Sequence, residues 1–119
     1  MEGRSGADKF YAVSLLAMAM FYAGAAGANP AHEQLMRMSD SDRNIALTRY
    51  LKASGQKCDL VTRNFFQGKG KKGNAFWNVQ CGNGQAYVIQ VENDSVGSTN
   101  VMNCSLLKAI NAGECFKKF

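Results

Sequence analysis

An uncharged segment near the N-terminus, from Phe10 to Ala28, restricts the folding of this 119-residue chain more than any other feature. As an α-helix it would be about 28 Å long, which is close to the thickness of the hydrocarbon core of a bilayer. Residues 1–28 are therefore predicted to be a membrane anchor or a signal segment. What remains is a head of about 90 residues, enough for one small domain.

Two fates of this segment stay open. The small residues Ala26 and Ala28 resemble a signal-peptide cleavage site, and cleavage there would release the head as a soluble periplasmic or secreted protein. The apolar run is longer than the core of a usual signal peptide, however, and Glu2 and Asp8 dilute the positive charge in front of it. The balance favours a retained membrane helix.

Three small residues recur every four positions within the segment: Ala19, Ala23 and Gly27. In a helix they lie on one face, where small side chains let a second helix approach closely. If the segment is retained, this face is predicted to pack against a larger membrane protein complex. Alanine is also common in signal peptides, so the same pattern is compatible with removal of the segment.

Four cysteines in the head indicate an oxidising compartment. An even number of cysteines in a small domain behind an export segment is typical of two disulfides, which places the head outside the cytoplasm; for a bacterial chain this is the periplasm. Of the three connectivities that four cysteines allow, we prefer Cys58 with Cys81, because a hairpin would bring them together, and Cys104 with Cys115, which bracket the last predicted helix. Because the sequence contains no C-x-x-C pair, both bridges are predicted to be structural.

The head is predicted to begin with a helix. Residues 29–38 are polar and are expected to form a linker. Ser39 is a suitable N-cap, and Gly55 is a suitable stop, so the helix should extend to about Ser54. One side of it is expected to lie on a sheet, because its apolar stripe comprises Ala46, Leu47, Tyr50 and Leu51, with Arg43 and Arg49 facing away.

Alternating apolar and polar residues predict the sheet. The run AFWNVQC, residues 75–81, places Trp77 on one side and Asn78 on the other, which is the pattern of a half-buried strand. The pair Asn83-Gly84 is a strong signal for a two-residue hairpin turn. A β-branched and aromatic run before residue 68 supplies the preceding strand.

The remaining elements complete an α+β head that spans residues 39–119. An alternating run at 85–92 predicts the third strand, and a short strand is expected at 99–103. A final helix is predicted from Ser105, with Gly113 as its stop. The expected order is helix, four-stranded antiparallel meander and C-terminal helix.

The stretch GKGKKGN, from Gly68 to Asn74, contains the string G-x-G-x-x-G that binds dinucleotides in other proteins. That chemistry requires a helix directly after the glycines, because the phosphates rest on the helix N-terminus. Here strands are predicted on both sides, so nucleotide binding is rejected. The stretch is predicted to be a hairpin tip that exposes Lys69, Lys71 and Lys72.

From residue 46 to residue 101, the helix, the hairpin and the run VENDSVGSTNV resemble a single PepSY-type unit. In such a unit a helix precedes a small antiparallel sheet, and an acid-to-glycine turn separates the last strands; Asp94 and Gly97 are the matching positions. The four cysteines are not part of that pattern. The resemblance implies an extracytoplasmic binding or inhibitory module.

The sequence offers no set of catalytic, cofactor-binding or metal-binding residues. His32 is the one histidine and lies in the expected linker, which excludes a Ser-His-Asp triad and a histidine-rich metal site. The cysteines are assigned to disulfides, and Asp40 and Asp42 are expected to cap a helix. We therefore expect a protein without enzymatic activity and without a cofactor.

The formal net charge of +5 favours binding to an anionic partner. The hairpin lysines and the terminal pair Lys117 and Lys118 are expected to attract an acidic protein surface or anionic lipid headgroups, although they also serve solubility. Nucleic acid is not an expected partner of an exported domain. Two functions stay open: a single-pass accessory subunit whose head covers the extracytoplasmic face of a membrane complex, and a cleaved soluble binding module or inhibitor.

Overall fold

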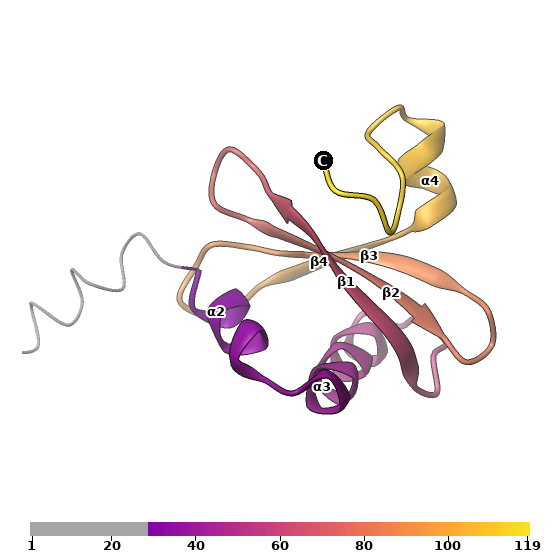
Figure 1. Cartoon of the computed structure of the whole chain (residues 1–119), viewed down its shortest axis with the longest axis horizontal. Helices are drawn as coiled ribbons and strands as arrows, with labels where there is room; N and C mark the ends of the chain where they lie inside the picture. The colour runs from indigo at the N-terminus through magenta and orange to yellow at the C-terminus, as the bar shows by residue number, and fades with distance from the viewer. Residues whose placement is uncertain (1–28) are drawn as a thin grey trace, which may run out of the picture.

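The computed structural model describes residues 29–119. The predicted membrane segment, with its small-residue face at Ala19, Ala23 and Gly27, lies outside the described residues. Within residues 29–119, no helix is long and apolar enough to cross a membrane. The described chain forms a small α+β domain around one sheet (Figure 1).

The sheet has four antiparallel strands in the order β1-β2-β3-β4, which confirms the predicted meander. Its strands are β1 (Val61–Lys69), β2 (Ala75–Cys81), β3 (Ala86–Val91) and β4 (Thr99–Asn103). The register places Trp77 of β2 between Phe66 of β1 and Ile89 of β3, so these three side chains share a face. The same face carries most of the buried core.

Helix α3 (Asp40–Ala53) packs its apolar side on this face, as its sequence pattern predicts. The backbone N–H of Asp42 donates to Ser39 Oγ over 3.2 Å, and Gly55 adopts a left-handed φ of +82° just after the helix end. Leu47 and Leu51 are fully buried. Thr48 also ties the helix to the sheet, because its Oγ1 accepts from the backbone N–H of Val61 over 2.8 Å.

Both predicted disulfides are confirmed. The bridge between Cys58 and Cys81 closes the end of the sheet opposite the lysine-rich hairpin, with its Cα atoms 5.6 Å apart. The bridge between Cys104 and Cys115, with a Cα separation of 5.9 Å, joins the start of α4 (Cys104–Ala109) to the chain beyond it. Helix α4 ends at Ala109, earlier than predicted.

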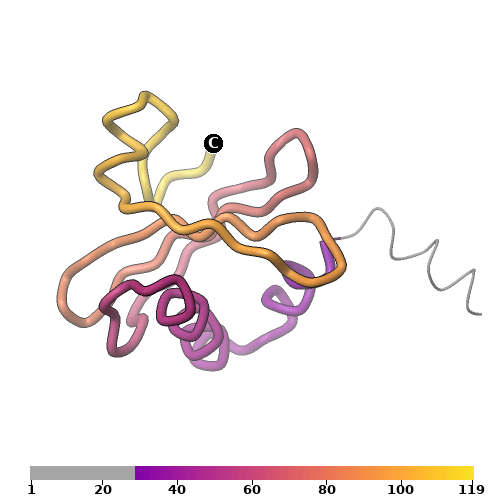
Figure 2. Tube along the Cα trace, turned by 180° about the vertical axis from the view of Figure 1, so that it is seen from behind, coloured from indigo at the N-terminus to yellow at the C-terminus, as the bar shows by residue number. Residues whose placement is uncertain are grey.

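Residues 29–38 contain a packed helix where a linker was expected. Helix α2 (Pro30–Arg37) lies beside α3 on the same side of the sheet, as Figures 1 and 2 show. Its Leu35 is fully buried, and the buried Asn29 side chain caps it while donating to the backbone oxygens of Gly73 and Val91. The helix is thus attached to the sheet by an apolar contact and by a hydrogen-bonded cap.

The other face of the sheet is covered by α4 and the C-terminal tail, which we define as residues 114–119 (Figure 1). Asn78, predicted on the exposed side of β2, is therefore fully buried. Its Nδ2 donates to Gln67 Oε1 (3.1 Å), and its Oδ1 accepts from the backbone N–H of Phe116 (2.8 Å). Gln67 Nε2 donates to the backbone oxygens of Glu114 (2.8 Å) and Lys117 (3.1 Å). This amide network holds the tail on the sheet.

Replacing Asn78 by Ala should lower the free energy of unfolding by about 1–3 kcal/mol, because the buried Gln67 Oε1 and the part-buried Phe116 N–H would both lose their hydrogen-bond partner. Urea unfolding of the oxidised protein measures this difference. Asn100→Ala, at an exposed position of β4, is the matched control and should change stability by less than about 0.5 kcal/mol. Equal effects of the two substitutions would show that the buried network does not stabilise the fold.

Candidate functional site

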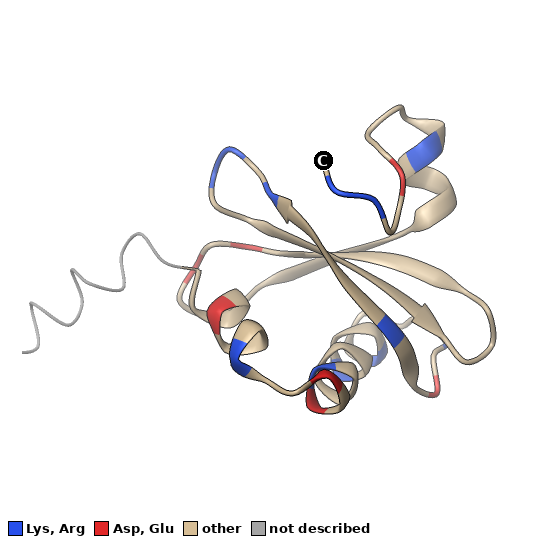
Figure 3. Cartoon of the chain, viewed as in Figure 1, with Lys and Arg blue, Asp and Glu red and all other residues tan. Residues whose placement is uncertain are grey.

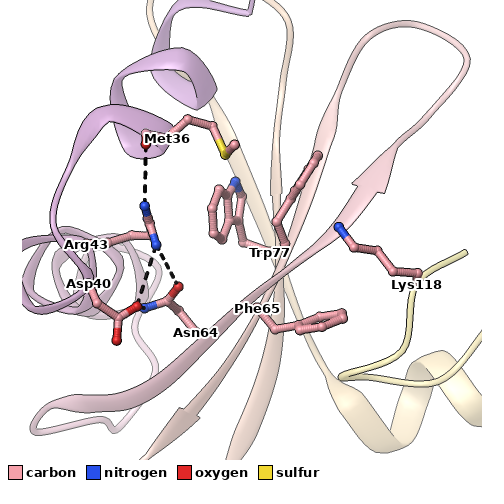
Figure 4. A pocket seen from close by; sticks show the side chains of 8 residues that line it. Met36, Asp40, Arg43, Asn64, Phe65, Trp77 and Lys118 are labelled. Carbon is pink, nitrogen blue, oxygen red and sulfur yellow. Dashed lines mark hydrogen bonds and ion pairs between the residues drawn. The ribbon is translucent and has the colours of Figure 1, made fainter.

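A surface cleft lies at the exposed edge of β1, between the α2–α3 side of the sheet and the C-terminal tail (Figure 4). Its volume is about 380 Å³. Strand β1 runs along it and contributes side chains to both faces of the sheet, because neighbouring residues point in opposite directions. The cleft is lined by Met36, Asp40, Arg43, Asn64, Phe65, Phe66, Trp77 and Lys118.

Phe66 and Trp77 line the inner part of the cleft, and the buried His32 ring packs against both. Phe66 lies 5.2 Å from Trp77 and 4.6 Å from His32, measured between ring centroids. Trp77 Nε1 donates a hydrogen bond of 3.0 Å to His32 Nδ1, which fixes the orientation of both rings. The hydrogen bond joins α2 to β2, so this side of the cleft is rigid.

His32 is buried, and burial is the main cause of a lowered pKa for its imidazole. The positive charge of Lys69 lowers the pKa further, and Glu33 opposes this effect. The neutral form is also the one that accepts the hydrogen bond from Trp77 at Nδ1. His32 therefore serves the fold, and its bonded nitrogen is not available for proton transfer to a ligand.

Arg43, predicted to face away from the sheet, points into the structure. Its guanidinium donates to the backbone oxygens of Leu35 (2.9 Å) and Met38 (2.9 Å), and it lies 5.2 Å from the centre of the Trp77 ring. The oxygens at the end of α2 lack helical partners, which explains this position. Arg43 is thus largely occupied by structural contacts.

Asn64 connects the cleft to α3. Its Oδ1 accepts from Arg43 (3.3 Å), and its Nδ2 donates to Asp40 Oδ1 (3.0 Å) and Asn44 Oδ1 (2.7 Å). Asp40, predicted as a helix cap, also lies 3.5 Å from Arg43 at the cleft rim. These bonds pair the polar side chains on the helical side of the cleft. The net charge on that side is therefore close to zero.

The opposite side of the cleft is cationic. Lys118 reaches from the C-terminal tail and places its Nζ 4.5 Å from the Phe66 ring centre and 5.5 Å from that of Phe65. The Arg63 guanidinium lies 4.0 Å from the centre of the Phe116 ring. Contact with an aromatic face holds a cation in place without neutralising it. Both residues are exposed, so both charges remain available to a ligand.

The tail also brings positive charge to the predicted hairpin tip. The Phe119 ring lies 5.2 Å from that of Phe76, and the backbone N–H of Phe119 donates to Gln67 O over 3.3 Å. Figure 3 accordingly shows the basic residues of the hairpin and of the tail on the same side of the sheet. We call this surface the basic face; it comprises Arg63, Lys69, Lys71, Lys72, Lys117 and Lys118.

The hairpin tip itself has the geometry expected of a turn. Gly70 N–H donates to Asn74 O (2.8 Å), and Gly73 has a left-handed φ of +80°. The glycine-lysine stretch connects β1 to β2 and does not precede a helix, so the structure lacks the context that nucleotide binding needs. Lys69, Lys71 and Lys72 are exposed, and within residues 29–119 none of them forms an ion pair.

The predicted acid-to-glycine turn is held together by hydrogen bonds within the turn itself. Asp94 Oδ1 accepts from the backbone N–H groups of Val96, Gly97 and Ser98, at 2.7–3.2 Å. Hydrogen bonds from Ser98 are the main cause of the lowered pKa of Asp94, and those from Gly97 and Val96 act in the same direction. Gly97 has a φ of +69°, which favours glycine. The PepSY-type resemblance stays a prediction.

Within residues 29–119, no three His, Cys, Asp or Glu side chains lie close enough together to hold a metal ion. The cysteines of this part of the chain are all in disulfides. The described surface offers an aromatic cleft next to exposed cations. Such a surface suits noncovalent binding of an anionic group that carries apolar neighbours.

The sequence analysis found the hairpin lysines and the terminal lysines but not the cleft. His32 and Asn64 were missed because their partners are distant in sequence. Asn29 followed by Pro30 did carry a signal, since an N-cap residue followed by proline is typical of a helix start. No comparable local signal marked Asn64.

Comparison with known proteins does not assign the chain to a family. The chain matches no protein-family model, no curated protein and no solved structure.

The lowered pKa of His32 predicts a specific dependence of stability on pH. Below the ordinary histidine pKa of about 6.5, the unfolded chain binds a proton that the folded state resists, so stability should fall as pH decreases. Urea unfolding between about pH 7.5 and about pH 5.5 covers this window. His32→Gln should be less stable at neutral pH and should show a flatter pH dependence. An unchanged slope in the variant would assign the effect to other groups.

Proposed function

We propose that the described domain is a non-enzymatic, extracytoplasmic protein-binding domain whose basic face binds an acidic surface of a partner protein. The observation that carries this proposal is the convergence of cations from three separate segments: β1, the β1–β2 hairpin and the C-terminal tail. The tail is held there by a disulfide and by the buried amide network. Folding thus brings together positive charges that are far apart in the sequence.

The aromatic contacts favour a binding role over solubility alone. Lysines that only keep a protein soluble need no fixed position, whereas Lys118 and Arg63 lie on phenylalanine rings beside the cleft. Fixed cations lose less conformational entropy when a ligand binds. An acidic protein surface with apolar residues matches this combination better than a lipid headgroup layer, because the cleft also offers apolar area.

The membrane segment determines the form that this function takes. With residues 1–28 retained, the protein would be a single-pass accessory subunit, with the helix packed on a larger membrane complex and the head on its extracytoplasmic face. With the segment cleaved, it would be a soluble periplasmic or secreted binding module or inhibitor. The periplasmic location and the partner in both forms are part of the proposal.

Replacing Lys69, Lys71 and Lys72 by Gln should weaken binding of the full-length chain to poly-glutamate and flatten its salt dependence. The matched control replaces Arg49, Lys52 and Lys57, which are also exposed but lie in α3 and in the segment before β1, outside the basic face. Both variants have the same net charge. The hairpin variant should bind at least about tenfold more weakly than the control, since charges at the contact act most strongly.

Isothermal titration at two salt concentrations measures this difference. Equal losses in the two variants would show that net charge alone governs binding, which contradicts a specific basic face. Vesicles that contain phosphatidylglycerol serve as a second probe. Hairpin-dependent binding to the vesicles without binding to poly-glutamate would overturn the protein partner in favour of a lipid surface.

A further inference from the structure

The exposed edge of β1 has backbone groups that are free to pair with another strand. Cys81 N–H donates to Gln85 O (2.8 Å), towards β3, and backbone direction alternates along a strand. The backbone N–H and C=O groups of Val79 and Trp77 therefore also point towards β3. Their partners across the β1–β2 ladder, Asn64 and Phe66, direct their own N–H and C=O groups away from the sheet.

These four groups lie at the cleft. Among residues 29–119, no hydrogen bond of a turn, loop or cap uses them. Before and after these residues along β1, the outward backbone groups already have partners: Val61 N–H donates to Thr48 Oγ1 (2.8 Å), and Gln67 O accepts from Phe119 N–H (3.3 Å). Unpaired edge groups bordered in this way can accept a short additional strand.

We propose that the cleft binds an extended acidic segment of a partner protein, which adds as a strand to the edge of β1 at Asn64–Phe66. This inference depends on the proposed function and specifies its mode of binding. Backbone hydrogen bonds to the edge would supply part of the affinity, and side chains on alternate sides of the segment would supply specificity.

The two sides of the edge differ in chemistry, and this difference defines the segment. On the α2–α3 side, an incoming side chain meets Met36, Phe66 and Trp77, which suit an apolar residue, next to Asp40, Arg43 and Asn64, whose polar groups are already paired with one another. On the tail side it meets Arg63, and Lys118 from the tail lies at the edge itself, 5.5 Å from the Phe65 ring and 4.5 Å from the Phe66 ring; these exposed cations suit a carboxylate. The expected segment therefore alternates acidic and apolar residues.

The opposite edge of the sheet is a poorer site for an acidic strand. Strand β4 forms that edge, and the carboxylate of Glu92 accepts a hydrogen bond from the Asn100 side chain on it (3.1 Å). Asp94 lies in the turn before β4. Asp40 at the β1 edge is paired with Arg43, whereas neither Glu92 nor Asp94 forms an ion pair within residues 29–119, so the β4 edge repels an acidic segment more strongly.

The test uses a blocked peptide of about ten alternating Glu and Val residues, together with two isomers that carry N-methyl groups on all Val or on all Glu residues. In an extended peptide, all Val N–H groups point to one edge and all Glu N–H groups to the other. Only the isomer whose methylated N–H groups point towards β1 therefore loses hydrogen bonds to β1. Its affinity for the full-length chain should be about fivefold or more below that of the unmethylated peptide, and the other isomer should bind normally.

Lys118→Gln locates the site on the protein, with Lys108→Gln as a control of equal charge. Lys118→Gln should weaken binding of the unmethylated peptide about two- to fivefold, and Lys108→Gln should not. Binding should also slow amide hydrogen exchange at Asn64 and Phe66. Protection confined to Val101 on β4 would overturn the assignment of the edge.

The outcomes separate this inference from the proposed function. Equal affinity of all three peptides, or an equal loss in both methylated isomers, would overturn strand addition. The proposed function would then stand if poly-glutamate binding still depended on the hairpin lysines. If neither poly-glutamate nor the peptides bind through the basic face, both proposals fail.

Discussion

The hydrogen bond from Trp77 to His32 is the interaction on which this domain and its cleft most depend. It attaches α2 to the central strand β2, and the same indole packs on Phe66 and lies beside Arg43. Arg43 in turn bonds to the end of α2. Trp77 is almost completely buried, so the removal of its ring would leave a large cavity beneath the cleft.

The neighbouring residue organises the other face of the sheet in a different way. Asn78 points to the opposite side of β2 and, together with Gln67, forms hydrogen bonds with the C-terminal tail. Amides need specific partners once they are buried, so they fix one position of the tail where apolar contacts alone would allow several. Because the tail carries Lys118 to the cleft, the network on one face of the sheet contributes to the site at its edge.

The sequence predicted the features that depend on local periodicity. The apolar stripe with Leu47 and Leu51, the alternation around Trp77 and the turn at Asn83-Gly84 all arise from neighbouring residues, and so does the hairpin that pairs Cys58 with Cys81. Features that depend on distant partners were missed. Asn78 has the composition of an exposed strand position and is buried only because a segment 38 residues later covers it. The segment of α2 has a polar composition, and its position depends on contacts of Asn29 with remote backbone.

We propose that folding joins three segments of the chain into one binding face. A titration of the isotopically labelled full-length chain with poly-glutamate, followed by amide chemical shifts, tests it most directly. The amides of residues 63–66, 69–72 and 117–119 should shift together and with a single dissociation constant. Shifts of similar size at Arg49, Lys52 and Lys57, or shifts confined to the hairpin tip, would contradict a joined binding face.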